Sequence, residues 1–344
     1  MVRRIAPFAA LLALVAAGLW LALSGESPDV VCYASVDDEV VRPMLERFRA
    51  ETGLRVKVEV DTEATKSIGM ANRLLKEGRP GARPRADVYW NNEPAWTVRL
   101  ADAGVLEPYD SPAARDIPAA FRDPAGLWVA NGARARVLIA HSPSVAAARP
   151  SSYLDLADPR FKDRAAIARP LAGTTLTHLA ALRSLVGAAE FERWLRGAAG
   201  NGVAFASGNG SLAREVGRGA RAFGFTDTDD FAARRAAGES VEAVFPDQGE
   251  GQVGTFVLPV TVALVRGGPH PEAARRLYDW LVSPATEAAL SASSYATIPV
   301  RPGTPPGPQA VAPATFRAAK VDWREASKHV DAVLDLARSI LESK

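Results

Sequence analysis

Hydrophobic and polar residues follow one another in a strand, loop, helix, strand order near the start of the chain. The run Val30–Ala34 is apolar and predicts a buried strand, and Ser35–Asp38 is polar. Apolar residues then recur at helical spacing over Val40–Phe48, and Gly53 is a helix-ending residue. Leu54–Val60 alternates apolar and polar residues, which is the period of a strand. The pattern predicts an α/β fold, in which a small ligand binds at the carboxyl ends of the strands.

A second α/β pattern lies between two long extended stretches, Trp128–His141 and Thr255–Val265. It contains predicted strands at Ala165–Ala168, Val203–Ala206 and Ala220–Phe225, and predicted helices at Gly173–Val186 and Leu212–Gly217. We expect a two-lobed α/β clamshell with two crossover strands at its hinge, which closes around a ligand. Lobe one comprises residues 30–127 plus 254–300, lobe two comprises 128–253, and residues 301–344 form a loop and C-terminal helices that pack on the lobes.

The first 24 residues have the pattern of an export signal. A basic head, Met1–Arg4, precedes the uncharged apolar run Ile5–Leu23, and Ala22–Ser24 places small residues where a signal peptidase cleaves. The alternative is a retained membrane anchor, because an apolar run of this length just spans a bilayer. Both interpretations place the rest of the chain outside the cytoplasm, in the periplasm or tethered to the outer face of the inner membrane.

Composition and charge exclude several classes of protein. The single cysteine, Cys32, excludes an internal disulfide and is expected as a small buried apolar side chain. Of 41 basic residues, Arg3 and Arg4 leave with the signal, so 39 remain against 39 acidic residues. This balance excludes long-range attraction to nucleic acid or to an anionic membrane surface. We expect a monomer that binds a small ligand.

Short motifs along the chain resemble the periplasmic solute-binding proteins of ABC importers. They are Tyr33–Ser35, Glu51–Gly53, Ala86–Val88, Ala103–Pro108 and Arg134–Leu138, in this order, and the similarity continues to about residue 300. The resemblance implies the two-lobed fold, capture of a solute by hinge closure, and a membrane permease as partner.

Within that class the chain is most similar to the ferric-ion-binding branch. That branch carries two adjacent tyrosines in the loop after a late strand of lobe two. Here the corresponding loop, Thr226–Asp230, contains no tyrosine. The resemblance therefore implies an importer role with ferric iron, or another metal with a bound anion, as transported ligand, without tyrosinate ligands and without a tightly bound cofactor.

The acidic loop offers three carboxylates in four positions, at Asp227, Asp229 and Asp230. Hard cations take oxygen ligands of this kind, so these residues are the candidate metal ligands. The alternative is that Thr228 or Asp229 caps a helix beginning near Phe231, because acidic residues are also favoured in the first turn of a helix.

Two further loops, Gly173–Thr175 and Ser207–Ser211, each precede a predicted helix. Backbone N–H groups at helix N-termini bind anions, although Ser, Thr and Gly there also serve as ordinary caps and turns. Polar loops after the lobe-one strands complete the expected cleft. The predicted ligand-binding residues are Ser35, Asp37, Asn91, Glu93, Thr174, Thr175, Asn209, Ser211 and Thr226.

Other functions stay open on the sequence. An organic zwitterion or a phosphonate-like solute also satisfies a cleft that holds both carboxylates and an anion site. Asp37 and Asp227 facing each other would suit a secreted hydrolase, but the chain has no recognised catalytic motif, so we expect a binding protein and not an enzyme. A membrane-tethered sensor is favoured if the N-terminal segment is retained.

Overall fold

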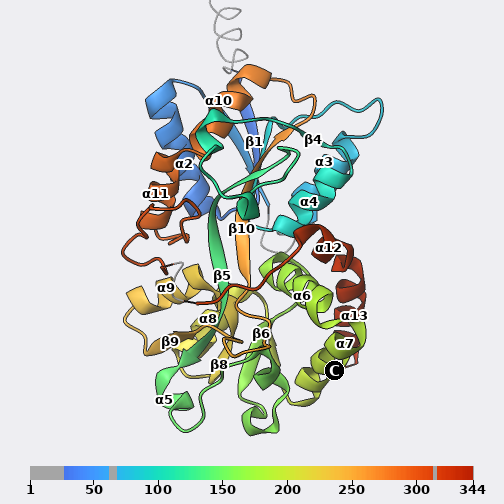
Figure 1. Cartoon of the computed structure of the whole chain (residues 1–344), viewed down its shortest axis with the longest axis vertical. Coiled ribbons are helices and arrows are strands. Elements are labelled where there is room, and N and C mark those ends of the chain that lie inside the picture. Colours follow the sequence, from blue (N-terminus) through green and yellow to red (C-terminus); the bar gives the residue numbers. More distant parts are fainter. Residues whose placement is uncertain (1–26, 62–67, 313–315, 344) are drawn as a thin grey trace, which may run out of the picture.

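The computed structural model describes residues 27–61, 68–312 and 316–343. Two α/β lobes lie one above the other in Figure 1 and are joined by the long strand β5 (Val129–His141). The predicted signal peptide or anchor at residues 1–24 lies outside the described residues. Over the described ranges, none of the helices is long and apolar enough to cross a membrane.

The sheet of the upper lobe has the strand order β2-β1-β3-β10. β1 is parallel to β2 and β3, and β10 is antiparallel to β3. Every residue of β1 is buried, which explains its unbroken apolar sequence, because a strand covered on both faces has no polar side. The elements of this lobe are β1 (Val30–Ala34), α2 (Asp38–Thr52), β2 (Val56–Val60), α3 (Ile68–Glu77), β3 (Val88–Asn91), α4 (Pro94–Asp102), β4 (Leu106–Glu107), the 3-10 helices at Pro112–Ala114 and Ala119–Phe121, β10 (Val257–Val265), α10 (Pro271–Leu281) and α11 (Pro284–Ala292).

Strand β5 belongs to the sheets of both lobes. Ala135 lies opposite Val257 of β10, whereas the next residue, Arg136, lies opposite Asp227 of β8. The sheet therefore passes from one lobe to the other between two adjacent residues of β5. The residue boundaries that the sequence pattern drew between the lobes stay predictions.

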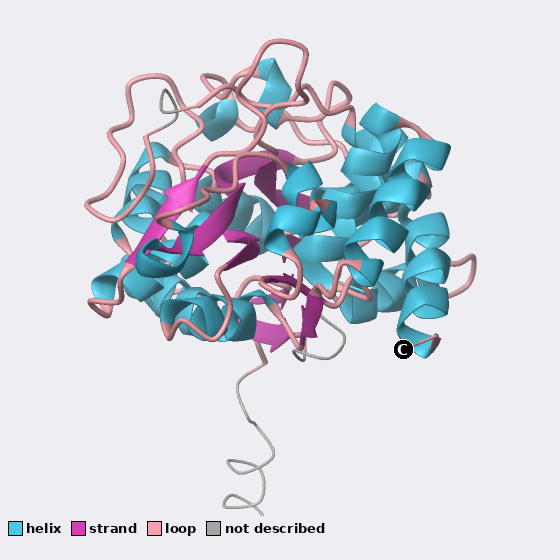
Figure 2. Cartoon of the chain, turned by 90° about the horizontal axis from the view of Figure 1, so that it is seen from below, coloured by secondary structure: helices cyan, strands magenta, loops and turns pink. Residues whose placement is uncertain are grey.

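The lower lobe places β8 between β5 and β6, with β7 at the edge and β9 beside β5. Seen from below, the strands occupy the middle of the molecule and helices surround them (Figure 2). The elements of this lobe are α5 (Ser142–Val145), the 3-10 helices at Tyr153–Ala157 and Pro159–Phe161, β6 (Ala165–Ala168), α6 (Gly173–Val186), α7 (Ala188–Gly200), β7 (Ala204–Ala206), α8 (Asn209–Gly217), β8 (Phe223–Asp227), α9 (Thr228–Ala236) and β9 (Val241–Val244).

The C-terminal helices bridge the two lobes. α12 (Trp323–Lys328) packs against α4 of the upper lobe and α6 of the lower lobe, and α13 (Val330–Glu342) packs on α6 and α7, as Figure 1 shows along the right side of the molecule. Arg99 of α4 forms a bidentate pair with Asp331 of α13, at 2.7 and 3.0 Å. The end of the chain is thus a third connection between the lobes, in addition to β5 and the segment that leads into β10.

Two helix starts that the sequence pattern predicted are wrong. α8 begins at Asn209 instead of Leu212, because the Ser211 hydroxyl accepts a hydrogen bond from the Gly208 N–H and adds a turn. α9 begins at Thr228 instead of near Phe231, so Asp227 is its N-cap residue. Both polar loops are therefore shorter than expected, and their side chains are fixed by helix geometry.

We expect Gly224→Ala to destabilise the lower lobe. A Cβ at Gly224 would lie 2.4 Å from the Ala166 carbonyl oxygen, so β8 and β6 would have to separate, at a cost of roughly 1–3 kcal/mol. Gly200→Ala is the matched control, because a Cβ there meets nothing within 4 Å. Chemical denaturation measures both free energies of unfolding, and an equal effect of the two substitutions would contradict the assigned strand packing.

Candidate functional site

A cavity of about 240 Å³ opens between the lobes at the ends of α6, α8 and α9. The upper lobe contributes Asp37, β5 contributes Arg134, and the lower lobe contributes the rest. The polar and glycine residues that line it are Asp37, Arg134, Arg169, Gly173, Thr174, Thr175, Ser207, Gly208, Asn209, Gly210, Asp227, Asp229 and Asp230. Four of the nine predicted ligand-binding residues, Asp37, Thr174, Thr175 and Asn209, therefore meet at one place with the three carboxylates of the acidic loop.

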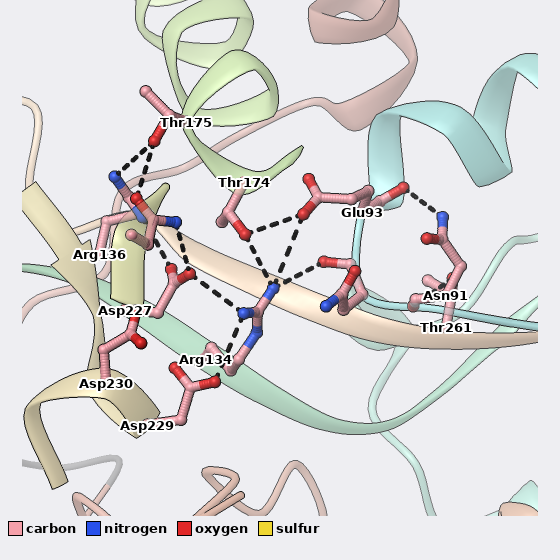
Figure 3. Close-up of polar contacts among 12 residues, drawn as sticks. Asn91, Glu93, Arg134, Arg136, Thr174, Thr175, Asp227, Asp229, Asp230 and Thr261 are labelled. Carbon is pink, nitrogen blue, oxygen red and sulfur yellow. Dashed lines mark hydrogen bonds and ion pairs between the residues drawn. The ribbon is translucent and has the colours of Figure 1, made fainter. Parts of the chain in front are cut away.

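Asp227 is held by two buried arginines of β5 (Figure 3). Arg134 Nη1 donates to Asp227 Oδ2 at 3.0 Å, and Arg136 Nη1 donates to Asp227 Oδ1 at 3.0 Å. Arg134 and Arg136 are two residues apart on a strand, so both side chains project to the same side of the sheet. Asn209 Nδ2 adds a third hydrogen bond to Asp227 at 3.2 Å. Both oxygens of this carboxylate are therefore engaged inside the protein.

Arg134 also joins the two lobes. Its Nη2 donates to the Asn92 carbonyl at 3.0 Å in the upper lobe and to Thr174 Oγ1 at 3.1 Å in the lower lobe. Glu93 Oε1 lies 3.8 Å from the same guanidinium and accepts a hydrogen bond from Thr174 Oγ1 at 2.8 Å. Figure 3 shows these groups converging on one guanidinium. They are direct contacts between the lobes beside the cavity.

The acidic loop forms a compact cluster. One oxygen each of Asp227, Asp229 and Asp230 lies within 4.8 Å of the others, a spacing that a bound cation can span. Asp229 Oδ2 lies 3.6 Å from Arg134, and Asp229 Oδ1 is buried and has no hydrogen-bond partner among the described residues. Asp230 Oδ2 accepts a hydrogen bond from Thr226 Oγ1 at 2.6 Å. The cluster thus has one buried carboxylate oxygen, Asp229 Oδ1, that no described residue satisfies.

The pKa values of the carboxyl groups at the site are shifted first by burial and then by neighbouring charges. Burial and the neighbouring Asp230 and Asp227 raise the pKa of Asp229 to about 8, and burial and Asp227 raise the pKa of Asp230 to about 6. Burial also raises the pKa of Glu93 to about 7. For Asp227 burial acts in the same direction, but the guanidiniums of Arg134 and Arg136 outweigh it and lower its pKa. Only Asp227 is therefore fully compensated by positive charge.

Helix N-termini form another part of the cavity lining. Gly173, Thr174 and Thr175 open α6, and Asn209 opens α8. Thr175 Oγ1 donates to Asn209 Oδ1 at 2.9 Å, which ties the two helix starts together. The exposed guanidinium of Arg169 also lines the cavity and makes no ion pair with any described residue. These groups suit an anion.

Some of the predicted ligand-binding residues do not line the cavity. Ser35 Oγ donates to Asp61 Oδ2 at 3.0 Å, and Asn91 Nδ2 donates to the Glu93 carbonyl at 2.7 Å. Ser211 Oγ donates to the Gly208 carbonyl at 2.8 Å. Thr226 orients Asp230 from β8. The side chains of these residues hold the loops of the site in position.

The sequence reasoning did not select Arg134, Arg136 or Arg169 as site residues. The available signal was the Arg-x-Arg spacing inside an otherwise apolar strand. A charged side chain buried in a sheet needs an opposite charge, and Asp227–Asp230 is an acidic run at the end of a predicted strand that can supply it.

A larger cavity of about 520 Å³ lies on the upper lobe and is lined by Tyr109, Ser111 and Arg122, among others. Its hydroxyl groups are already used, because Tyr109 and Ser111 both donate to Asp279, at 2.9 and 2.5 Å. The cavity between the lobes has the unsatisfied carboxylates and the helix N-termini, so we consider it the functional site.

Comparison with known proteins points to one family. The family model described as "Bacterial extracellular solute-binding protein" matches residues 29–295. Iron uptake protein A1 of Synechocystis is 28% identical over 292 residues, which cover 82% of this chain and 78% of that protein.

Solved structures agree in fold. Iron-bound HitA from Pseudomonas aeruginosa matches with a TM-score of 0.80 at 24% identity, covering 90% of this chain and 98% of HitA. The periplasmic binding protein AfuA from Actinobacillus pleuropneumoniae, with exogenous fructose-6-phosphate bound, matches with a TM-score of 0.77 at 19% identity, covering 92% and 99% of the two chains. The predicted two-lobed clamshell is thereby confirmed.

We expect Glu93→Gln to flatten the pH dependence of stability. The pKa of Glu93 is about 7 in the folded protein against an ordinary value of 4.5, so the folded state binds this proton more tightly than the unfolded state. The contribution of Glu93 to the free energy of unfolding is complete below pH 4.5 and is lost as the pH rises through 7. The loss amounts to up to about 3 kcal/mol. Urea denaturation at pH 4.5 and pH 8 should show a smaller difference for Glu93→Gln than for the wild type. The exposed Glu39→Gln is the control, and a wild-type slope in Glu93→Gln would contradict the shift.

Proposed function

We propose that this chain, which belongs to the bacterial extracellular solute-binding proteins, captures a small solute between its lobes outside the cytoplasm. It then delivers the solute to the permease of an ABC importer. The lobes are joined by β5 at a point beside the cavity, so rotation about this region opens and closes the site. The residues around the cavity are suited to binding and release.

The cargo that we infer is a metal ion, ferric iron first, held together with an anion. The observation that carries this inference is the geometry of the acidic cluster: oxygens of Asp227, Asp229 and Asp230 lie within 4.8 Å of one another at the cavity, and Asp229 Oδ1 has no hydrogen-bond partner among the described residues. Carboxylate oxygens are the ligands that hard cations prefer. Two similar proteins support iron as the cargo, because one is named Iron uptake protein A1 and the other, HitA, is described as iron-bound.

The anion would complete the coordination of the ion from the side of the helix N-termini. The N-termini of α6 and α8 direct backbone N–H groups toward the cavity, and Arg169 adds a positive charge at its edge. When a metal ion is bound together with an oxyanion such as phosphate or citrate, the ion pairs with the carboxylates and the oxyanion pairs with the helix N-termini and Arg169. Asp227 takes part indirectly, because Arg134 and Arg136 already occupy its oxygens.

A second candidate is an organic solute with an anionic group and an amine or hydroxyl groups. The observation in its favour is Arg134, which already supplies positive charge beside Asp227 and Asp229. Hydroxyl groups of such a solute would donate hydrogen bonds to Asp229 and Asp230. AfuA, with fructose-6-phosphate bound, is a neighbour in fold with a cargo of this kind.

Isothermal titration with ferric citrate and with fructose 6-phosphate separates the two candidates. We expect the wild type to bind ferric citrate, and Asp229→Asn/Asp230→Asn to bind it at least about tenfold more weakly, because two ligand carboxylates are lost. Asp335→Asn, on the exposed face of α13, is the control for loss of a carboxylate. Undiminished binding of ferric citrate by the double variant would remove the acidic loop from the site, and binding of fructose 6-phosphate alone would favour the organic cargo.

Export is the second part of the proposed function. The basic head and the apolar run Ile5–Leu23 support it. Alkaline phosphatase becomes active only outside the cytoplasm, so a fusion after Gly25 should be active in an export-competent host. An inactive but intact fusion would contradict export, and a fusion that lacks residues 1–24 is the control.

A further inference from the structure

Arg134 lies among three carboxyl groups at the cleft. Its guanidinium is 3.0 Å from Asp227, 3.6 Å from Asp229 and 3.8 Å from Glu93, and the residue is 3% exposed. Figure 3 shows it at the centre of these carboxylates. The residue also lines the cavity, so its side chain borders directly on the space that a cargo enters.

Neutralising Asp227 does not by itself require Arg134. Arg136 is fully buried behind it and donates to the other oxygen of Asp227 at 3.0 Å. Arg134 is the guanidinium that in addition reaches Asp229, the carboxylate with an oxygen left unpaired among the described residues. The two arginines therefore differ in their relation to the cavity. Arg136 pairs with Asp227 inside the protein, whereas Arg134 lies next to Asp229, where it competes with a cationic cargo.

The guanidinium of Arg134 also lies beside an aromatic ring. The ring of Tyr295 lies beside it, with the guanidinium carbon 5.9 Å from the ring centroid, a distance at which a cation is attracted to the face of an aromatic ring. Tyr295 is 2% exposed, and its hydroxyl has no hydrogen-bond partner among the described residues. Tyr295 is held there by its own loop, because Ala133 and Ile298 exchange backbone hydrogen bonds of 2.9 and 2.8 Å one residue before Arg134.

We propose that Arg134 is a tethered cation that competes with the cargo for Asp229 and so sets a charge threshold for entry to the cleft. A singly charged group, such as an ammonium, gains no more from these carboxylates than the guanidinium that it displaces. A divalent or trivalent ion gains more because its total charge is larger, and it displaces Arg134. This inference rests on the proposed metal cargo and deepens it, since it excludes amines as the cationic part of the solute.

Titration of the purified protein with Tb³⁺, a trivalent ion that prefers oxygen ligands, tests the competition. We expect Arg134→Gln to bind Tb³⁺ at least about tenfold more tightly than the wild type, because the competing charge is gone. Arg134→Lys should stay close to the wild type, since it restores the charge. Arg169→Gln is the matched control: it removes a charge from the same cavity without contact to Asp229, and should change the affinity less than Arg134→Gln does.

Phosphoethanolamine, which pairs an anionic group with one ammonium, tests the threshold on the wild type without any variant. We expect no binding by the wild type and measurable binding by Arg134→Gln. Binding of phosphoethanolamine by the wild type would overturn the threshold, and equal or weaker Tb³⁺ binding by Arg134→Gln would overturn the competition. If neither protein binds Tb³⁺, the proposed metal cargo is wrong, and the inference is wrong with it. If the wild type binds Tb³⁺ and Arg134→Gln binds it no more tightly, the inference alone is wrong.

Discussion

The pairing of Asp227 with Arg134 and Arg136 is the interaction on which the rest of the cleft depends. The two arginines lie on the strand shared by both lobes, and Asp227 lies at the junction of β8 and α9. Loss of Asp227 would leave the buried Arg136 without the ion-pair partner that it has among the described residues, and an uncompensated buried charge costs about 3–5 kcal/mol. This pairing therefore fixes the acidic loop to the hinge region, and the positions of Asp229 and Asp230 follow from it.

The same pairing divides the acidic residues into two kinds. Both oxygens of Asp227 accept hydrogen bonds from arginines of the protein, whereas Asp229 has an oxygen without a partner among the described residues. Three carboxylates that look equivalent in sequence thus differ in what they can offer a ligand. The difference arises because both arginines reach Asp227 at 3.0 Å, whereas Arg134 alone lies near Asp229, at 3.6 Å.

The fold was predictable to a large extent, and the site only in part. β1 and α2 lie where an apolar run and helical spacing placed them, because burial on both faces of a strand or on one stripe of a helix leaves a clear pattern. The acidic loop was recognised, but Arg134 was not, because the sequence does not show that an arginine in an apolar strand faces a loop 93 residues away. Ser35 and Asn91 look like ligands in sequence, yet their hydrogen bonds go to neighbouring loops, a choice that only the packed structure decides.

The order of the strands has a consequence for the way the chain folds. β3 (Val88–Asn91) pairs with β10 (Val257–Val265), and the whole lower lobe lies between them in sequence. Contacts over such separations form slowly, because a long loop must close first. The first strands to be synthesised cannot complete their sheet until the last third of the chain is available, and α12 and α13 fasten both lobes only after that. For a chain that we propose to be exported, this delay keeps the N-terminal part unfolded while it crosses the membrane.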